Sequence, residues 1–121
     1  EGNFHGYHDQ VMFAIGTPAE HLGPLENPTR YPGSTGIAAG LANQVIVVPY
    51  NRVDLLEQAF DQHAHELAAV IGEPIYYNAG CIIPSEAFIT ALRELTAQNG
   101  VLLIFDEVLS AFRMGLGGAQ E

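Results

Sequence analysis

Two adjacent carboxylates, Asp106 and Glu107, follow the most apolar run of the sequence. That run, VLLIF at 101–105, is typical of a parallel strand covered on both faces. Groups that follow such a strand lie at the carboxyl edge of a sheet, where α/β proteins bind ligands. A carboxylate there could hold the positive charge of a cofactor, or it could bind magnesium. These residues alone leave both alternatives open.

Neighbouring side chains at a strand end point in opposite directions, so we expect Asp106 and Glu107 to have different roles. Facing a cleft, Asp106 could accept a charge-assisted hydrogen bond from a protonated ring nitrogen. Glu107 could pair with Arg113 or cap a turn of the helix-like continuation that follows. The alternative is two solvated acids at a strand end.

A third carboxylate, Glu73, follows the apolar run at 67–71 in the same way, so two adjacent strands are expected to carry acids to one edge. Asn78 lies five residues later. Its side-chain amide could donate to a ligand oxygen or shape the turn, and the residues alone favour the turn.

The amino-terminal segment FHGYHD holds aromatic and imidazole rings that could stack on a flat cofactor, beginning with Phe4 and His5. Metal binding by His5, His8 and Asp9 is an alternative, but their spacing is not a specific zinc signature. We therefore predict no metal site.

The composition favours a small-molecule site in a globular α/β chain. The 121 residues can form one domain or part of one, and the formal charge of −10 disfavours nucleic acid and anionic lipid as partners. No apolar run is long enough to span a membrane, and the single cysteine, Cys81, suggests a reduced, cytoplasmic location.

The sequence contains no lysine and does not begin with methionine. A phosphate-binding P-loop needs a lysine, and so does an enzyme that binds an aldehyde as a Schiff base. Either interpretation of Asp106 therefore requires residues outside this chain, and we interpret the chain as an internal fragment of a larger protein.

The hydrophobic periodicity predicts alternating strands and helices, joined by crossovers into a mainly parallel sheet. Glycine and proline make residues 16–44 a long loop, whose length favours a place near a site. The predicted strands are 45–48, 67–71 and 101–105, and the predicted helices are 53–65 and 84–99.

The motifs FHGYHD, PYN, GEPIYYNAG, IFDEVLSAFR and GGAQE, in this order, resemble class III aminotransferases, and most of all glutamate-1-semialdehyde 2,1-aminomutase-like members. The resemblance implies an α/β fold, part of the large domain of fold type I enzymes that depend on pyridoxal 5'-phosphate (PLP). Residues 1–121 would be the central portion of that domain, with 16–44 as an active-site loop. The family's active sites form at the interface of a homodimer.

The resemblance also implies roles for individual residues. Asp106 matches the aspartate that binds the pyridine nitrogen, and Val108 the valine on one face of the ring. Phe4 matches the aromatic residue on the other face, with His5 beside it. Asn78 matches a residue that helps to hold the phenolic oxygen of the cofactor.

Three further positions refine the resemblance. Glu73 matches a glutamate near the substrate side of the pocket. Leu109 stands where many members have glutamine, which favours the aminomutase-like branch, and Arg52 replaces an aspartate. The lysine that holds the cofactor normally follows this region, so this chain would supply contacts to the ring only.

The leading hypothesis is PLP-dependent transfer of an amino group between small amino and keto or aldehyde substrates. One alternative is a non-catalytic chain, either truncated or degenerate. A more distant one is a nucleotide hydrolase with Asp106 and Glu107 in a Walker B motif, for which the chain lacks the P-loop lysine.

Overall fold

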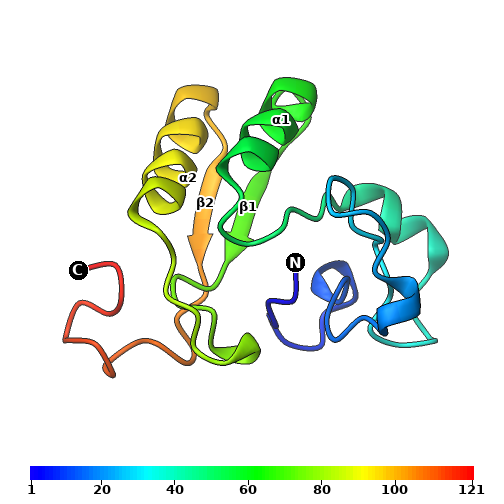
Figure 1. Ribbon diagram of the computed structural model, residues 1–121, viewed down its shortest axis with the longest axis horizontal. Coiled ribbons are helices and arrows are strands. Elements are labelled where there is room, and N and C mark those ends of the chain that lie inside the picture. Colours follow the sequence, from blue (N-terminus) through cyan, green and yellow to red (C-terminus); the bar gives the residue numbers. More distant parts are fainter. The chain divides into compact units, whose positions relative to one another are not determined.

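The structure is a computed structural model that describes all residues, 1–121, and it divides into two compact units. The first unit is Glu1–Tyr50 and the second is Asn51–Glu121. Figure 1 shows that the second unit contains all the labelled helices and strands.

The first unit has no α-helix and no named strand. Its regular elements are the short 3-10 helices η1 (Asp9–Val11), η2 (Ala19–His21) and η3 (Ala39–Gln44). A small core forms around Met12, Phe13 and Ala14, which are at most 8% exposed. The irregular backbone of residues 16–44 agrees with their glycine and proline content, whereas their predicted role as an active-site loop stays a prediction.

The prediction of a strand at 45–48 is wrong, because the structure has no strand there. The β-branched residues there do favour extended backbone, and Val45 has φ −124° and ψ 134°. The carbonyl oxygen of Val48 accepts a hydrogen bond of 2.8 Å from the amino group of Glu1. No strand runs beside this segment, however, and extended backbone becomes a strand only through a ladder of hydrogen bonds with a neighbour.

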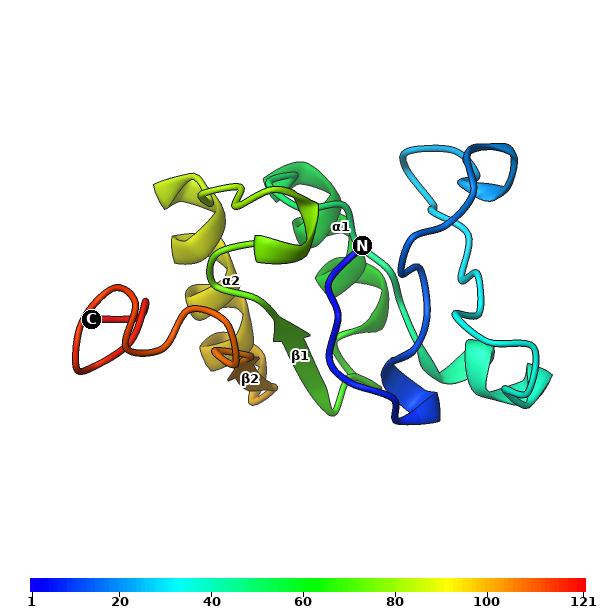
Figure 2. The ribbon, with the colours of Figure 1, turned by 90° about the horizontal axis from the view of Figure 1, so that it is seen from below.

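The second unit follows the predicted order of helix, strand, helix and strand. Its elements are α1 (Val53–His63), β1 (Ala69–Gly72), α2 (Glu86–Asn99) and β2 (Leu102–Phe105). The two strands pair in parallel, with Ala69 opposite Leu102 and Gly72 opposite Phe105. Figure 2 shows the pair from below, with α2 as the crossover between them.

Helix α2 begins after a residue that favours helix starts and ends at one that favours helix ends. The Oγ atom of Ser85 accepts a hydrogen bond of 3.2 Å from the N–H of Phe88, which satisfies a donor of the first turn. Gly100 ends the helix with a positive φ of 68°. The side chains that α2 buries are Phe88, Leu92 and Thr96, which are spaced four residues apart and so lie on one side of the helix.

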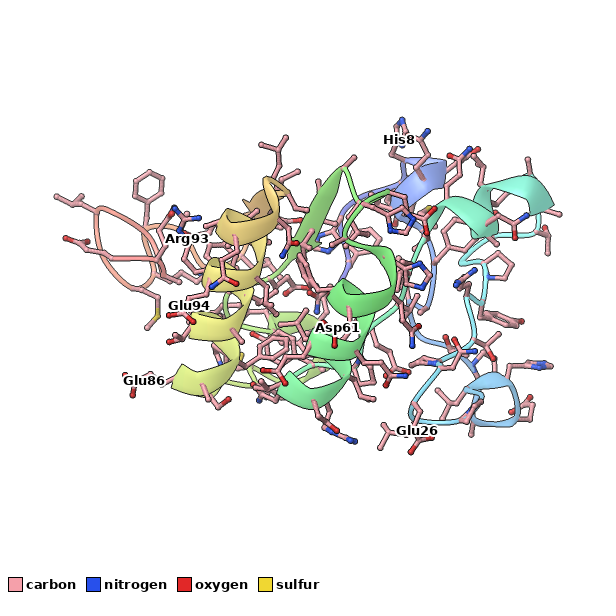
Figure 3. All side chains as sticks on the ribbon, turned by 90° about the horizontal axis from the view of Figure 1, so that it is seen from above. His8, Glu26, Asp61, Glu86, Arg93 and Glu94 are labelled. Carbon is pink, nitrogen blue, oxygen red and sulfur yellow. The ribbon has the colours of Figure 1, made fainter.

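Both helices have one apolar and one charged side. In α1 the buried side chains are Leu55, Leu56 and Phe60. Figure 3 shows Asp61 on α1 and charged residues of α2 at the outer surface of the helices. Neither helix has the length and apolar character required to cross a membrane.

The expectation that β2 is covered on both faces is wrong for this chain. Ile71, Leu102 and Ile104 lie on one face of the strand pair and are 39%, 67% and 44% exposed. Helix α2 contacts both α1 and β2, and Figures 1 and 2 show the two helices on one and the same side of the strand pair. No other element of the second unit is left to cover the exposed face.

Candidate functional site

Two carboxylates occupy equivalent positions just after the carboxyl ends of the paired strands β1 and β2. Gly72 and Phe105 are the last paired residues of the two strands, and Glu73 and Asp106 follow them directly. The N–H of Asp106 donates to the carbonyl oxygen of Gly72 over 2.9 Å, which extends the ladder by one hydrogen bond. The structure therefore confirms that the two acids reach one edge of the sheet.

The carboxylate of Asp106 is held by the turn that follows β2. Its Oδ1 atom accepts a hydrogen bond of 3.1 Å from the N–H of Val108. Such a bond between an aspartate and the second residue after it fixes the side chain relative to the backbone. The side chain of Val108 itself is 88% exposed.

Glu73 and Asn78 form one hydrogen-bonded unit. Glu73 is only 4% exposed, and its two carboxylate oxygens accept hydrogen bonds from different donors. Oε1 accepts from Nδ2 of Asn78 at 2.7 Å, and Oε2 accepts from the N–H of Tyr77 at 3.0 Å. The turn role that the residues alone favour for Asn78 is thus present, because its side chain binds back to the strand end.

Glu107 connects the strand end to a segment twelve residues later. Its Oε2 atom accepts hydrogen bonds from Oγ of Ser110 at 2.9 Å and from the N–H of Ala119 at 2.6 Å. Gly118 lies so close that a Cβ atom there would stand 2.5 Å from the same oxygen. The side chain of Glu107 thus binds the Ser110 hydroxyl of the following turn and a backbone N–H of the 118–119 segment, rather than capping that turn through one of its own backbone N–H groups.

Two other expectations for this region are wrong. Glu107 does not pair with Arg113, whose Nε atom donates to the carbonyl oxygen of Leu109 instead. The segment after Asp106 is a series of turns rather than a helix, and Phe112 has a positive φ of 58°. A residue in that conformation interrupts the repeating dihedral angles of an α-helix.

The environment of Glu107 lowers the pKa of its carboxyl below the ordinary value of 4.5. The main cause is the hydrogen bond from the Ala119 N–H, and the Ser110 hydroxyl adds to it, while desolvation opposes both. The folded state thus favours the ionised form, so Glu107 stabilises the fold above its unfolded pKa. This contribution is lost as the pH falls through the folded pKa.

We expect Glu107→Gln to lower the midpoint of thermal unfolding at neutral pH, and we expect its difference from the unchanged protein to shrink as the pH falls. Thermal scans between about pH 3 and pH 7 measure this difference. Glu26→Gln is the control, since Glu26 is exposed. A Glu107→Gln difference that stays constant over the whole pH range would contradict the assignment.

The first unit contains the other residues predicted to contact a cofactor. Phe4 and His5 are half-buried, and the ring of Phe4 meets the ring of Tyr7 edge to face, with centroids 5.3 Å apart. Gly6, which lies between Phe4 and Tyr7 in the sequence, has a positive φ of 85°. No group of three or more potential metal ligands comes together in the structure.

Sequence reasoning missed the connection between Glu107 and the 118–119 segment, and the pairing of Glu73 with Asn78. The signal for the first was weak, namely the glycines at 117 and 118. For the second, the five-residue spacing allowed contact but did not indicate it.

The family described as Aminotransferase class-III matches residues 1–119. The chain is 43% identical over 120 residues to the glutamate-1-semialdehyde 2,1-aminomutase of Rhodopirellula baltica. It is 48% identical over 120 residues to the protein of that name from Pyrobaculum aerophilum. Each alignment covers 99% of this chain but only 26% and 27% of the relative, so the chain spans about a quarter of the length of these relatives.

Solved structures give the same picture. An omega-transaminase from Sphaerobacter thermophilus matches with a TM-score of 0.79 and 34% identity, over 91% of this chain and 25% of its own. A transaminase with PLP bound matches with a TM-score of 0.80 and 30% identity, over 98% of this chain and 26% of its own. A glutamate-1-semialdehyde aminomutase from Pseudomonas aeruginosa matches with a TM-score of 0.64 and 31% identity, over 90% of this chain and 22% of its own.

Proposed function

Since this chain belongs to the class III aminotransferase family, we propose that it is the central portion of the PLP-binding large domain of an enzyme that transfers amino groups. The observation that carries the proposal is the carboxylate of Asp106, held by a turn at the carboxyl end of a parallel strand. This is where α/β proteins bind their ligands.

The side chains present fit the ring of PLP in their chemistry. Asp106 supplies a carboxylate, an acceptor for a protonated ring nitrogen, and Asn78 supplies an amide that can donate to a phenolic oxygen. When bound, PLP withdraws electrons from the carbon that carries the amino group of the substrate. The chain has no lysine, so covalent attachment of the cofactor requires a residue from elsewhere in the polypeptide.

Each residue then has a defined task. Asp106 keeps a proton on the ring nitrogen, because a carboxylate beside that nitrogen favours its charged form. Val108, Phe4 and His5 would be further contacts of the ring, as the resemblance to the family implies. The role of residues 16–44 as an active-site loop, which the resemblance implies, is part of the same proposal.

We further propose small amino and keto or aldehyde compounds as substrates, a homodimer as the assembly and the cytoplasm as the location. The aminomutase-like branch of the family is supported by the named relatives and by Leu109, which stands where many members have glutamine. The role of Glu73 near the substrate stays a prediction.

Absorption spectroscopy of the complete polypeptide that contains this chain tests the proposed function. We expect purified protein mixed with PLP to develop a visible band that differs from free PLP, and we expect an amino donor to bleach it. PLP mixed with the amino donor in the absence of protein is the control, because a free amine and the PLP aldehyde also react in solution. A complete polypeptide that leaves the spectrum of free PLP unchanged would contradict the proposal.

A further inference from the structure

The hydrogen bonds of Glu73 determine which way the amide of Asn78 faces. A carboxylate has only acceptor atoms, so the atom of Asn78 that lies 2.7 Å from Oε1 must be the donor, Nδ2. The carbonyl Oδ1 of Asn78 is therefore turned away from Glu73. Since an amide nitrogen carries two N–H groups, the second N–H of Nδ2 remains directed away from that carboxylate.

The loop that carries Asn78 is closed at its base as well. Tyr76 and Ile82 exchange two backbone hydrogen bonds of 3.0 Å each, and the 3-10 helix η4 (Tyr77–Ala79) lies between them. The 3.0 Å hydrogen bond from Tyr77 to Oε2 ties this helix to Glu73. One buried carboxylate thus holds both the backbone of the loop and the side chain at its tip.

We infer that Glu73 is a positioning residue, which fixes the amide of Asn78 so that one N–H is presented to the phenolic oxygen of the cofactor. This inference rests on the proposed function, because it needs a cofactor at the sheet edge. It differs from the role near the substrate that the resemblance implies for Glu73. Holding a donor in place before the ligand arrives reduces the entropy lost on binding.

The alternative orientation shows what Glu73 prevents. If residue 73 were glutamine, its own NH₂ group could donate to Oδ1 of Asn78, and the amide of Asn78 could then rotate by half a turn. A glutamine oxygen also could not serve both the Tyr77 N–H and Asn78 as the two carboxylate oxygens do. Glu73→Gln keeps the size of the side chain but removes its charge and one of the two acceptor oxygens that bind Tyr77 and Asn78.

The test is a double-mutant cycle on the complete polypeptide loaded with PLP, with Glu73→Gln, Asn78→Ala and the pair of changes together. The readout is the pH midpoint of the visible absorption band, which responds to a donor at the phenolic oxygen. We expect both single changes to move the midpoint in the same direction, by about half a pH unit, as loss of one ordinary hydrogen bond would. Glu73→Gln should add nothing once Asn78 is alanine, because Glu73 acts through Asn78.

A Glu73→Gln shift that persists in the Asn78→Ala background would overturn the inference, because Glu73 would then act on the cofactor without Asn78. Glu86→Gln is the matched control, since Glu86 is an exposed glutamate on α2 (Figure 3). Should Glu73→Gln fail to fold, Glu73→Asp takes its place, because aspartate keeps the carboxylate but is one methylene too short for both donors. The cycle is then judged by the same criterion.

The two proposals fail in different ways. If the complete polypeptide forms no visible band with PLP, the proposed function fails and the inference on Glu73 falls with it. If the band forms and the two shifts simply add, only the inference on Glu73 is overturned.

Discussion

Asp106→Asn in the complete polypeptide is expected to lower the rate of amino transfer by roughly 10- to 100-fold. A hydrogen bond that involves a charged group contributes about 1.5–3 kcal/mol, and about 1.4 kcal/mol corresponds to a tenfold change in rate. Asparagine still offers an oxygen to the N–H of Val108, so the turn after β2 can persist. The change therefore removes the charge rather than the local fold.

Steady-state kinetics with a small amino donor measure this effect, and the visible spectrum reports whether PLP is still bound. Asp61→Asn is the matched control, because it makes the same chemical change on the exposed surface of α1. A rate for Asp106→Asn equal to that of Asp61→Asn, with PLP bound in both, would show that Asp106 does not hold the ring proton.

Gly118→Ala is expected to destabilise the fold by about 2.5–5 kcal/mol. Gly118 has a positive φ of 85°, which costs about 1–2 kcal/mol for a residue with a Cβ atom. That Cβ atom would also lie 2.5 Å from Oε2 and 2.8 Å from Cδ of Glu107. The carboxylate must then move away from Ser110 and Ala119, and a hydrogen bond to a charged group contributes about 1.5–3 kcal/mol.

Chemical denaturation of the complete polypeptide measures the change in the free energy of unfolding. Gly36→Ala is the control, because no atom lies within 4 Å of a Cβ atom there and the backbone has no positive φ. If both variants unfold at the same denaturant concentration, the close contact between Gly118 and Glu107 does not stabilise the protein.

The elements with regular periodicity could be predicted from the sequence. Helix α2 has an apolar stripe, a serine at its start and a glycine at its end, and each of these is a local signal. Strand β2 has an uninterrupted apolar run. Residues 45–48 have a similar run, but whether such a run pairs depends on a neighbour that no local pattern specifies.

The candidate site could be predicted in its location but not in its internal contacts. Glu73 and Asp106 each follow a strand, and the parallel order brings their positions to one edge. The partners of these acids depend on loop conformation. The hydrogen bond from Ala119 to Glu107 joins residues twelve positions apart through a positive φ at Gly118, which neither propensity nor spacing predicts.

The register of the parallel pair determines where the chain can tolerate insertions and deletions. Residues 64–68 and 100–101 join helices to the amino ends of β1 and β2, so an insertion there changes the length of a connection and leaves Glu73 and Asp106 in place. A one-residue insertion or deletion within β2 would instead put another side chain at the position of Asp106 and reverse which face each residue occupies. Sequence length should therefore vary in the connections before these strands and stay constant within the strands.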